Sequence, residues 1–188
     1  MTTLYLARHG ETEENVAQIL QGQTPGHLTE NGRAQAAALA DKLARSGTHF
    51  DALVASDLTR AVDTAHILNG RLHLPFTLCP LLRERDFGSF TGVKITYAQT
   101  HPVPSDAESV EQMFGRARRF LIYILESFPG QTVIAVGHGL FDRCIQAVIR
   151  ATSISEIPRM GNAEVRRFEL DGQNFGAAHE SADAVSAD

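Results

Sequence analysis

The sequence has few cysteines, no excess of positive charge and no long apolar run. Its two cysteines, Cys79 and Cys144, have neither metal-site spacing nor a disulfide-rich pattern, which suits a reducing compartment and predicts two buried thiols. The formal net charge of -5 argues against a general nucleic-acid or acidic-membrane binder. No stretch approaches the roughly 18 apolar residues of a membrane span, and no signal-peptide pattern is present. We therefore expect a cytoplasmic protein with no membrane or nucleic-acid partner.

The length and apolar content are those of one folded domain. With 188 residues, 43% of them hydrophobic, the chain can bury a full core. We predict a single domain over residues 1–175. Residues 176–188 are small, polar and acidic without apolar spacing, which predicts a disordered acidic tail.

Short apolar runs alternate with segments of helical spacing. The runs predict strands, and the helical segments have capping residues or apolar positions every three to four residues. This alternation predicts an α/β fold, a three-layer sandwich whose mostly parallel central sheet has helices on both faces. The expected strands lie within 4–7, 51–56, 75–82, 131–136 and 163–170, and the expected helices within 29–46, 57–68, 109–128 and 140–149.

Arginine and histidine follow two of the expected strands. Arg8 and His9 come directly after 4–7, and Arg60 follows 51–56. Ligands of parallel sheets bind beyond the carboxyl ends of the strands, and guanidinium groups suit phosphate recognition. A neutral imidazole can attack phosphorus, and positive charge from Arg8 and Arg60 would keep His9 neutral. His9 is therefore a candidate nucleophile beside an anion pocket.

His138 stands between two glycines at the end of a third expected strand. Glycines let the backbone approach a ligand closely, and His138 could donate a hydrogen bond to the same phosphoryl oxygens. A lone histidine in a loop is more often a buried residue with satisfied hydrogen bonds, and only the pairing of His9 with His138 argues otherwise. We apply that plain interpretation to the remaining histidines: His27, His49, His66, His73, His101 and His179.

Glu84 is the candidate acid. Cleaving a phosphate ester requires a proton for the departing oxygen, and a phosphate bound beside Glu84 would favour its protonated form. Arg83 and Arg85 would oppose this if they pointed inward. Composition alone supports equally well a solvated charge cluster in this segment.

The string Arg8-His9-Gly10-Glu11-Thr12 resembles the signature of the histidine phosphatase superfamily, the phosphoglycerate mutase-like proteins. The resemblance covers nearly the whole chain up to about Leu170. It continues through Asn15, Gln21-Gly22, Leu28 to Gly32, Gln35-Ala36, Ser56 to Ala61, Thr64-Ala65, Leu82 to Gly92, Glu108-Ser109 and Val136 to Gly139, and faintly at Asn162-Ala163.

The resemblance implies a phosphohydrolase that forms a phosphohistidine on His9, with Glu84 as proton donor and then as the base that activates water. It implies no metal and no cofactor. The residues that it places around the phosphoryl group are Arg8, Arg60 and His138 as catalytic groups, and Asn15, Gln21, Thr12 and Gly139 as substrate-binding groups.

Two departures from the family pattern concern the substrate. Thr91 stands where such phosphatases often carry a second glutamate. The segment between Glu84 and Glu108 is short, where relatives commonly have a longer segment over the pocket, so we expect an open site. The expected partner is a small phosphorylated metabolite or a phosphoprotein, and the oligomeric state is left open.

Two alternatives remain. A phosphoglycerate mutase-type enzyme would use the same chemistry, although the compact middle of the chain leaves little room for the extra segments of such mutases. A non-catalytic module that binds a phosphorylated ligand ranks third, because it would be expected to have lost His9 or Glu84.

Overall fold

A five-stranded sheet runs through the middle of the computed structural model, which describes residues 1–171. Its strand order is β3-β2-β4-β1-β5. The first four of these run parallel, and β5 pairs antiparallel with β1. The strands are β1 (Thr2–Arg8), β2 (Ala52–Ala55), β3 (Phe76–Leu78), β4 (Thr132–Gly137) and β5 (Val165–Leu170).

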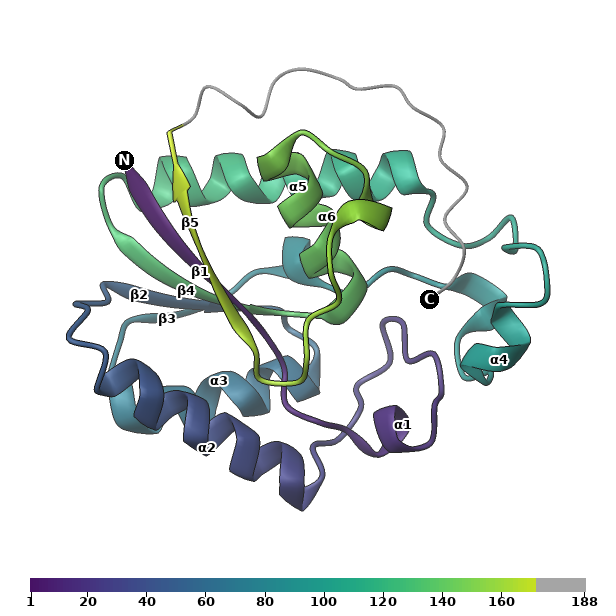
Figure 1. Ribbon diagram of the computed structural model, residues 1–188, viewed down its shortest axis with the longest axis horizontal. Coiled ribbons are helices and arrows are strands. Elements are labelled where there is room, and N and C mark those ends of the chain that lie inside the picture. Colours follow the sequence, from purple (N-terminus) through teal and green to yellow (C-terminus); the bar gives the residue numbers. More distant parts are fainter. Residues whose placement is uncertain (172–188) are drawn as a thin grey trace.

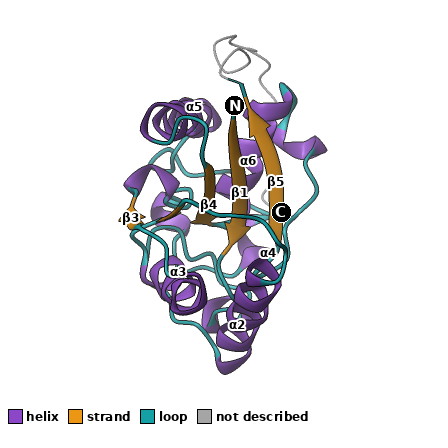
Figure 2. Ribbon diagram, turned by 90° about the vertical axis from the view of Figure 1, so that its left-hand side faces the viewer, coloured by secondary structure: helices purple, strands orange, loops and turns teal. Residues whose placement is uncertain are grey.

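Helices cover both faces of this sheet (Figure 1). Figure 1 shows one helix pair above the strands and the other below, and Figure 2 shows the same layers from the side. The predicted α/β class with a mostly parallel sheet is therefore confirmed. The upper pair is α5 (Val110–Ser127) and α6 (Gly139–Arg150), and the lower pair is α2 (Glu30–Ala44) and α3 (Thr59–Leu72).

The alternation of side chains along the strands explains the two layers. Successive side chains of a strand point to opposite faces, so a strand covered on both sides is apolar throughout. In β4, Val133 and Ala135 pack with α5 and α6, whereas Ile134 and Val136 pack with α2 and α3. The segment that predicted this strand is thus apolar throughout because helices cover both of its faces.

Two of the long helices, α2 and α5, begin with side-chain caps. Thr29 Oγ1 accepts a hydrogen bond from the backbone N–H of Gly32 at 2.9 Å. Ser109 and Gln112 form a capping box, with each side chain accepting from the other's backbone N–H. The helix expected over 57–68 is α3, which begins at Thr59 and continues to Leu72, and His73 ends it in a left-handed conformation.

Two four-residue helices were not predicted, because one turn is too short to show periodicity. They are α1 (Glu13–Val16) and α4 (Ile95–Ala98), at the right of Figure 1. The chain beside α1 pairs with the chain before α4: Leu20 donates to the Val93 carbonyl at 2.9 Å, and Gly92 to the Leu20 carbonyl at 2.8 Å. This pairing joins two distant segments next to the carboxyl ends of the strands.

The prediction that the other histidines are buried was wrong. They were expected to be buried, but all five that the structure describes are exposed, which leaves their ring nitrogens accessible to water. These are His27, His49, His66, His73 and His101. His179 and the predicted acidic tail lie outside the described residues, and the domain boundary at residue 175 stays a prediction. Both cysteines are buried, as expected.

Two glycines let the loop after β1 pack against the start of α2. A Cβ on Gly32 would overlap the Glu11 carbonyl oxygen, and one on Gly10 would overlap the Gly32 carbonyl oxygen. We expect Gly32→Ala to lower the free energy of unfolding by about 1–3 kcal/mol, because the backbone must shift. Gly70→Ala, inside α3 with nothing within 4 Å of the added carbon, should stabilise by up to about 1 kcal/mol. Urea unfolding measures both, and equal shifts in the two variants would contradict the packing argument.

Candidate active site

The two predicted histidines meet at the carboxyl ends of neighbouring strands. Arg8 and Gly137 are register partners in β1 and β4, so the residues that follow them lie side by side. The rings of His9 and His138 have centroids 5.2 Å apart and are tilted by 59°. The His9 backbone N–H also donates to the Gly137 carbonyl at 3.1 Å. Residues 129 positions apart in sequence thus form one buried pair.

A hydrogen bond to its own neighbour fixes the tautomer of His9. The ring Nδ1 lies 2.7 Å from the Gly10 carbonyl oxygen. A carbonyl oxygen can only accept, so Nδ1 carries the proton and Nε2 keeps a free lone pair. The side chain is only 2% exposed, which holds the ring in this orientation. His9 therefore presents an unprotonated Nε2 to the site.

The surroundings of His9 favour its neutral form. Burial is the main cause that lowers the pKa of His9 well below its usual value, and the charges of Arg60 and Arg8 lower it further. From the sequence, only the charges of the two arginines were expected to keep His9 neutral. The imidazole therefore stays unprotonated, and able to act as a nucleophile, on the acid side of neutrality.

Arg60 is a fully buried guanidinium near the start of α3. Its Nε donates to His138 Nδ1 at 3.2 Å. Its terminal nitrogens donate to the carbonyls of Gly22 at 2.8 Å and Thr24 at 2.6 Å. Burial lowers the pKa of Arg60 to about 10, so the side chain still carries its charge near neutral pH. Arg60 thus supplies positive charge and ties the loop over residues 22–25 to the histidine pair.

The bond from Arg60 also decides the tautomer of His138. Because Arg60 Nε–H donates, His138 Nδ1 accepts and the remaining proton sits on Nε2. That Nε2 is buried and has no hydrogen-bond partner among the described residues. Burial, followed by the charge of Arg60, lowers the pKa of His138 well below its usual value. His138 therefore offers one unused N–H donor beside the free Nε2 of His9.

Arg8 completes the positive side of the site. One terminal nitrogen donates to the Met160 carbonyl at 2.7 Å, while its Nε is buried and without a partner in the described part of the chain. Burial lowers the pKa of Arg8, and nearby carboxylates oppose that shift. Two guanidinium charges and an unused imidazole N–H thus converge where an anion would be stabilised.

The carboxylate of Glu84 is held at the amino end of α6. It accepts backbone hydrogen bonds from Leu140 at 3.1 Å, Phe141 at 3.0 Å and Arg85 at 2.8 Å. The neighbouring arginines donate elsewhere: Arg83 forms a bidentate ion pair with Asp57, and Arg85 Nε donates to the Glu108 carbonyl. Arg83 is thus turned away from Glu84, whereas Arg85 is buried and its charge still interacts with that of Glu84.

The four predicted substrate-binding residues all lie around this centre. Thr12 is fully buried, and its hydroxyl caps α1 by accepting from the Asn15 backbone at 3.2 Å. Gln21 is buried with an unpartnered Oε1 among the described residues. Gly139 begins α6, and a Cβ there would come within 3.2 Å of Arg8 Nε. Thr12 therefore places Asn15, and Gly139 leaves room for Arg8.

A family model for the histidine phosphatase superfamily (branch 1) matches residues 4–181. The chain belongs to the histidine phosphatase superfamily.

Relatives within the superfamily include phosphatases and mutases. A metal-independent phosphoserine phosphatase of Arabidopsis thaliana is 32% identical over 191 residues, covering 93% of this chain and 79% of that protein. A 2,3-bisphosphoglycerate-dependent phosphoglycerate mutase of Bartonella quintana is 30% identical over 174 residues, covering 82% and 84%. The solved structure of Bacillus stearothermophilus YhfR aligns with a TM-score of 0.85 and 30% identity over 98% of each chain.

Two supports of this superfamily site were not predicted from the sequence. Asn162 donates to the His9 carbonyl and to Asn15 Oδ1, both at 3.2 Å. Thr64 Oγ1 accepts from the Gly10 backbone at 3.1 Å and donates to the Arg60 carbonyl at 2.7 Å. The faint match at Asn162-Ala163 and the match at Thr64-Ala65 were the available signals, but neither one named a contact.

Arg116 on α5 supports the backbone of Glu84. It pairs with Glu108 at 2.6 Å and donates to the carbonyls of Arg83 at 2.5 Å and Glu84 at 3.4 Å. It was also not predicted, although its partner Glu108 belonged to the matched pair Glu108-Ser109. This ion pair explains why a glutamate far along the chain matters to the position of Glu84.

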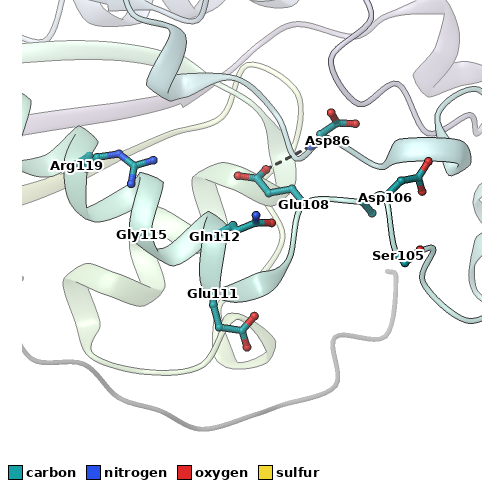
Figure 3. A pocket seen from close by; sticks show the side chains of 9 residues that line it. Asp86, Ser105, Asp106, Glu108, Glu111, Gln112, Gly115 and Arg119 are labelled. Atoms are coloured by element: carbon teal, nitrogen blue, oxygen red, sulfur yellow. Dashed lines mark hydrogen bonds between the residues drawn. The ribbon is translucent and has the colours of Figure 1, made fainter.

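A separate acidic cavity of about 740 Å³ is lined in part by the same Glu108 (Figure 3). It contains none of the predicted site residues, and its carboxylates would repel a phosphate. Its lining consists of Asp86, Ser105, Asp106, Ala107, Glu108, Glu111, Gln112, Gly115 and Arg119.

Within residues 1–171, no group of three or more His, Cys, Asp or Glu side chains could hold a metal ion. No helix in that range is long and apolar enough to cross a membrane.

Replacing Arg60 by lysine tests the bonds that organise this site. A single ammonium cannot reproduce the donors to His138, Gly22 and Thr24. We expect Arg60→Lys to weaken inorganic phosphate binding by at least about tenfold and to lower stability by about 2 kcal/mol, since it leaves buried carbonyls unpaired. Calorimetry and thermal unfolding measure the two effects. Arg33→Lys, at a surface ion pair with Asp63, is the matched control and should change neither.

Proposed function

We propose that this protein is a metal-independent phosphomonoesterase that works through a phosphohistidine on His9. The observation that carries the proposal is the pair of neutral imidazoles with opposite tautomers, one with a free Nε2 lone pair and the other with an unused Nε2–H. A nucleophile and an oxyanion donor are needed together, and the fully buried guanidinium of Arg60 and the half-buried one of Arg8 supply the counter-charge.

The proposed first half-reaction transfers the phosphoryl group to the enzyme. His9 Nε2 forms a bond to phosphorus while the ester P–O bond breaks. Arg8, Arg60 and His138 stabilise the charge on the equatorial oxygens. The departing oxygen takes a proton from Glu84. The positive charge on the phosphorylated ring is stabilised by the Gly10 carbonyl, which accepts from Nδ1–H.

The proposed second half-reaction restores the enzyme. Glu84, now a carboxylate, removes a proton from a water molecule that attacks phosphorus. The Nε2–P bond breaks, inorganic phosphate leaves, and His9 returns to its neutral form with the proton still on Nδ1. Glu84 is protonated again, so the cycle consumes one water and regenerates every group.

The relatives support a small phosphorylated metabolite as the substrate, with a phosphoprotein as the bulkier possibility. Phosphoserine is the substrate class suggested by the Arabidopsis thaliana relative. Turnover in EDTA tests the activity itself: we expect hydrolysis of p-nitrophenyl phosphate, followed by selection among phosphorylated metabolites, phosphoamino acids and phosphopeptides. No release of phosphate from any of these esters would reject the hydrolase.

A phosphoglycerate mutase is the second candidate, favoured by the 30% identity to the Bartonella quintana enzyme. It would keep its phosphohistidine long enough to return the group to a rebound product. Incubation with 3-phosphoglycerate and catalytic 2,3-bisphosphoglycerate separates the two functions. Formation of 2-phosphoglycerate faster than inorganic phosphate would favour the mutase.

A further inference from the structure

Asp142 is a buried carboxyl group that the proposed mechanism does not use. It lies in the first turn of α6 and is 0% exposed. Neither of its side-chain oxygens has a hydrogen-bond partner among the described residues. A buried, unsatisfied carboxyl is costly, so its presence beside a functional centre calls for an explanation.

Asp142 and Arg8 lie against neighbouring residues of the same backbone segment. A Cβ on Gly137 would overlap Asp142 Oδ1, so the carboxyl group presses against the last residue of β4. The Arg8 guanidinium lies over Gly139, two residues further along the same backbone. The Asp142 N–H donates to the His138 carbonyl at 2.8 Å. Asp142 therefore stands behind the phosphate-binding groups, in contact with the backbone that carries them.

The charges around Asp142 come from three other elements. Burial, and then the charge of Glu84, raises the pKa of Asp142 well above its usual value, while the nearby backbone N–H of His138, Arg8 on β1 and Arg166 on β5 oppose this. The Arg166 guanidinium already makes four hydrogen bonds, to Glu164, Gln146 and two backbone carbonyls. Arg8 keeps a buried, unused Nε–H. Of the two arginines, Arg8 is thus the one left to respond to a charge on Asp142.

We infer that Asp142 is a positioning residue for Arg8 that makes phosphate binding depend on pH. When Asp142 is uncharged, the Arg8 guanidinium is free to bind the phosphoryl group. A charged Asp142 attracts that guanidinium and offsets its positive charge, so affinity for phosphate falls. By linkage, a bound phosphate dianion in turn favours the protonated carboxyl. The inference rests on the proposed function, because it takes Arg8 to be a phosphate ligand.

Calorimetric binding of inorganic phosphate to wild type and Asp142→Asn tests it without turnover. Asparagine has the same shape and cannot ionise. The ratio of wild-type to variant affinity cancels the ionisation of phosphate itself. We expect this ratio to be close to one at the acid end of a pH series, where the Asp142 carboxyl is protonated, and to fall by about tenfold at the alkaline end, where it is charged. Asp142→Ala, equally uncharged, should show the same pH dependence as asparagine if the asparagine variant folds poorly.

Glu126→Gln on the exposed face of α5 is the control, and its affinity should follow that of wild type at every pH. A ratio that stays constant with pH would overturn the role of Asp142 while leaving the proposed hydrolase intact. A falling ratio in a protein that hydrolyses no ester would support the role of Asp142 and reject the hydrolase. Failure of wild type to bind phosphate would overturn both.

Discussion

Replacing His9 by alanine should abolish turnover, with kcat falling by more than about a thousandfold. The reason is the loss of the atom that forms the bond to phosphorus. His138 cannot replace it, because its Nδ1 accepts from Arg60 and its Nε2 carries a proton. Steady-state hydrolysis of p-nitrophenyl phosphate in EDTA measures the loss.

His66→Ala is the control for His9→Ala, since His66 is an exposed histidine on α3 whose ring packs edge-on against that of Phe76. It should keep wild-type kcat and KM. Acid quench of the wild type during turnover should trap a phosphorylated histidine that is missing from His9→Ala. Equal activity in wild type and His9→Ala would show that a different group attacks phosphorus.

The architecture was readable from the sequence because burial on both faces leaves a clear pattern. The apolar run that became β4 and the capped, regularly spaced segments that became α2 and α5 each satisfy a local rule. The helix α1 has a local capping box of Thr12 and Asn15, and α4 has no side-chain cap. Each is a single turn, too short to show periodicity, and the two segments are joined by pairing between Leu20 and Val93. Structure that arises from tertiary pairing leaves no periodic signal.

The site residues were named from a resemblance, but their physical states depend on contacts that no spacing reveals. The tautomers of His9 and His138 depend on a carbonyl and on Arg60, a residue 78 positions from His138. The larger cause of the lowered His9 pKa is burial, whereas the sequence had pointed to charge. Asp142 carried no motif, and only its unpartnered oxygens single it out.

Glu84→Gln should separate leaving groups by their need for a proton. A glutamine cannot donate a proton to the departing oxygen or take one from water. For a phosphate ester of an ordinary alcohol, we expect kcat/KM to fall by about a hundredfold to ten-thousandfold. The p-nitrophenolate ion leaves without a proton, so its first half-reaction should slow by less than about tenfold.

A burst of p-nitrophenol from Glu84→Gln, followed by slow turnover, would locate both roles on the same carboxyl group. The burst reports phosphorylation of His9, and the slow phase reports hydrolysis without a base. The variant should fold, because an amide oxygen in the place of Oε1 can still accept from Arg85 and Phe141, and only the bond from Leu140 is lost. Glu111→Gln, at an exposed glutamate in the separate acidic cavity, is the matched control and should hydrolyse both esters at wild-type rates. Equal losses on the two esters in Glu84→Gln would instead mean that Glu84 acts through the position of α6 and not as the acid.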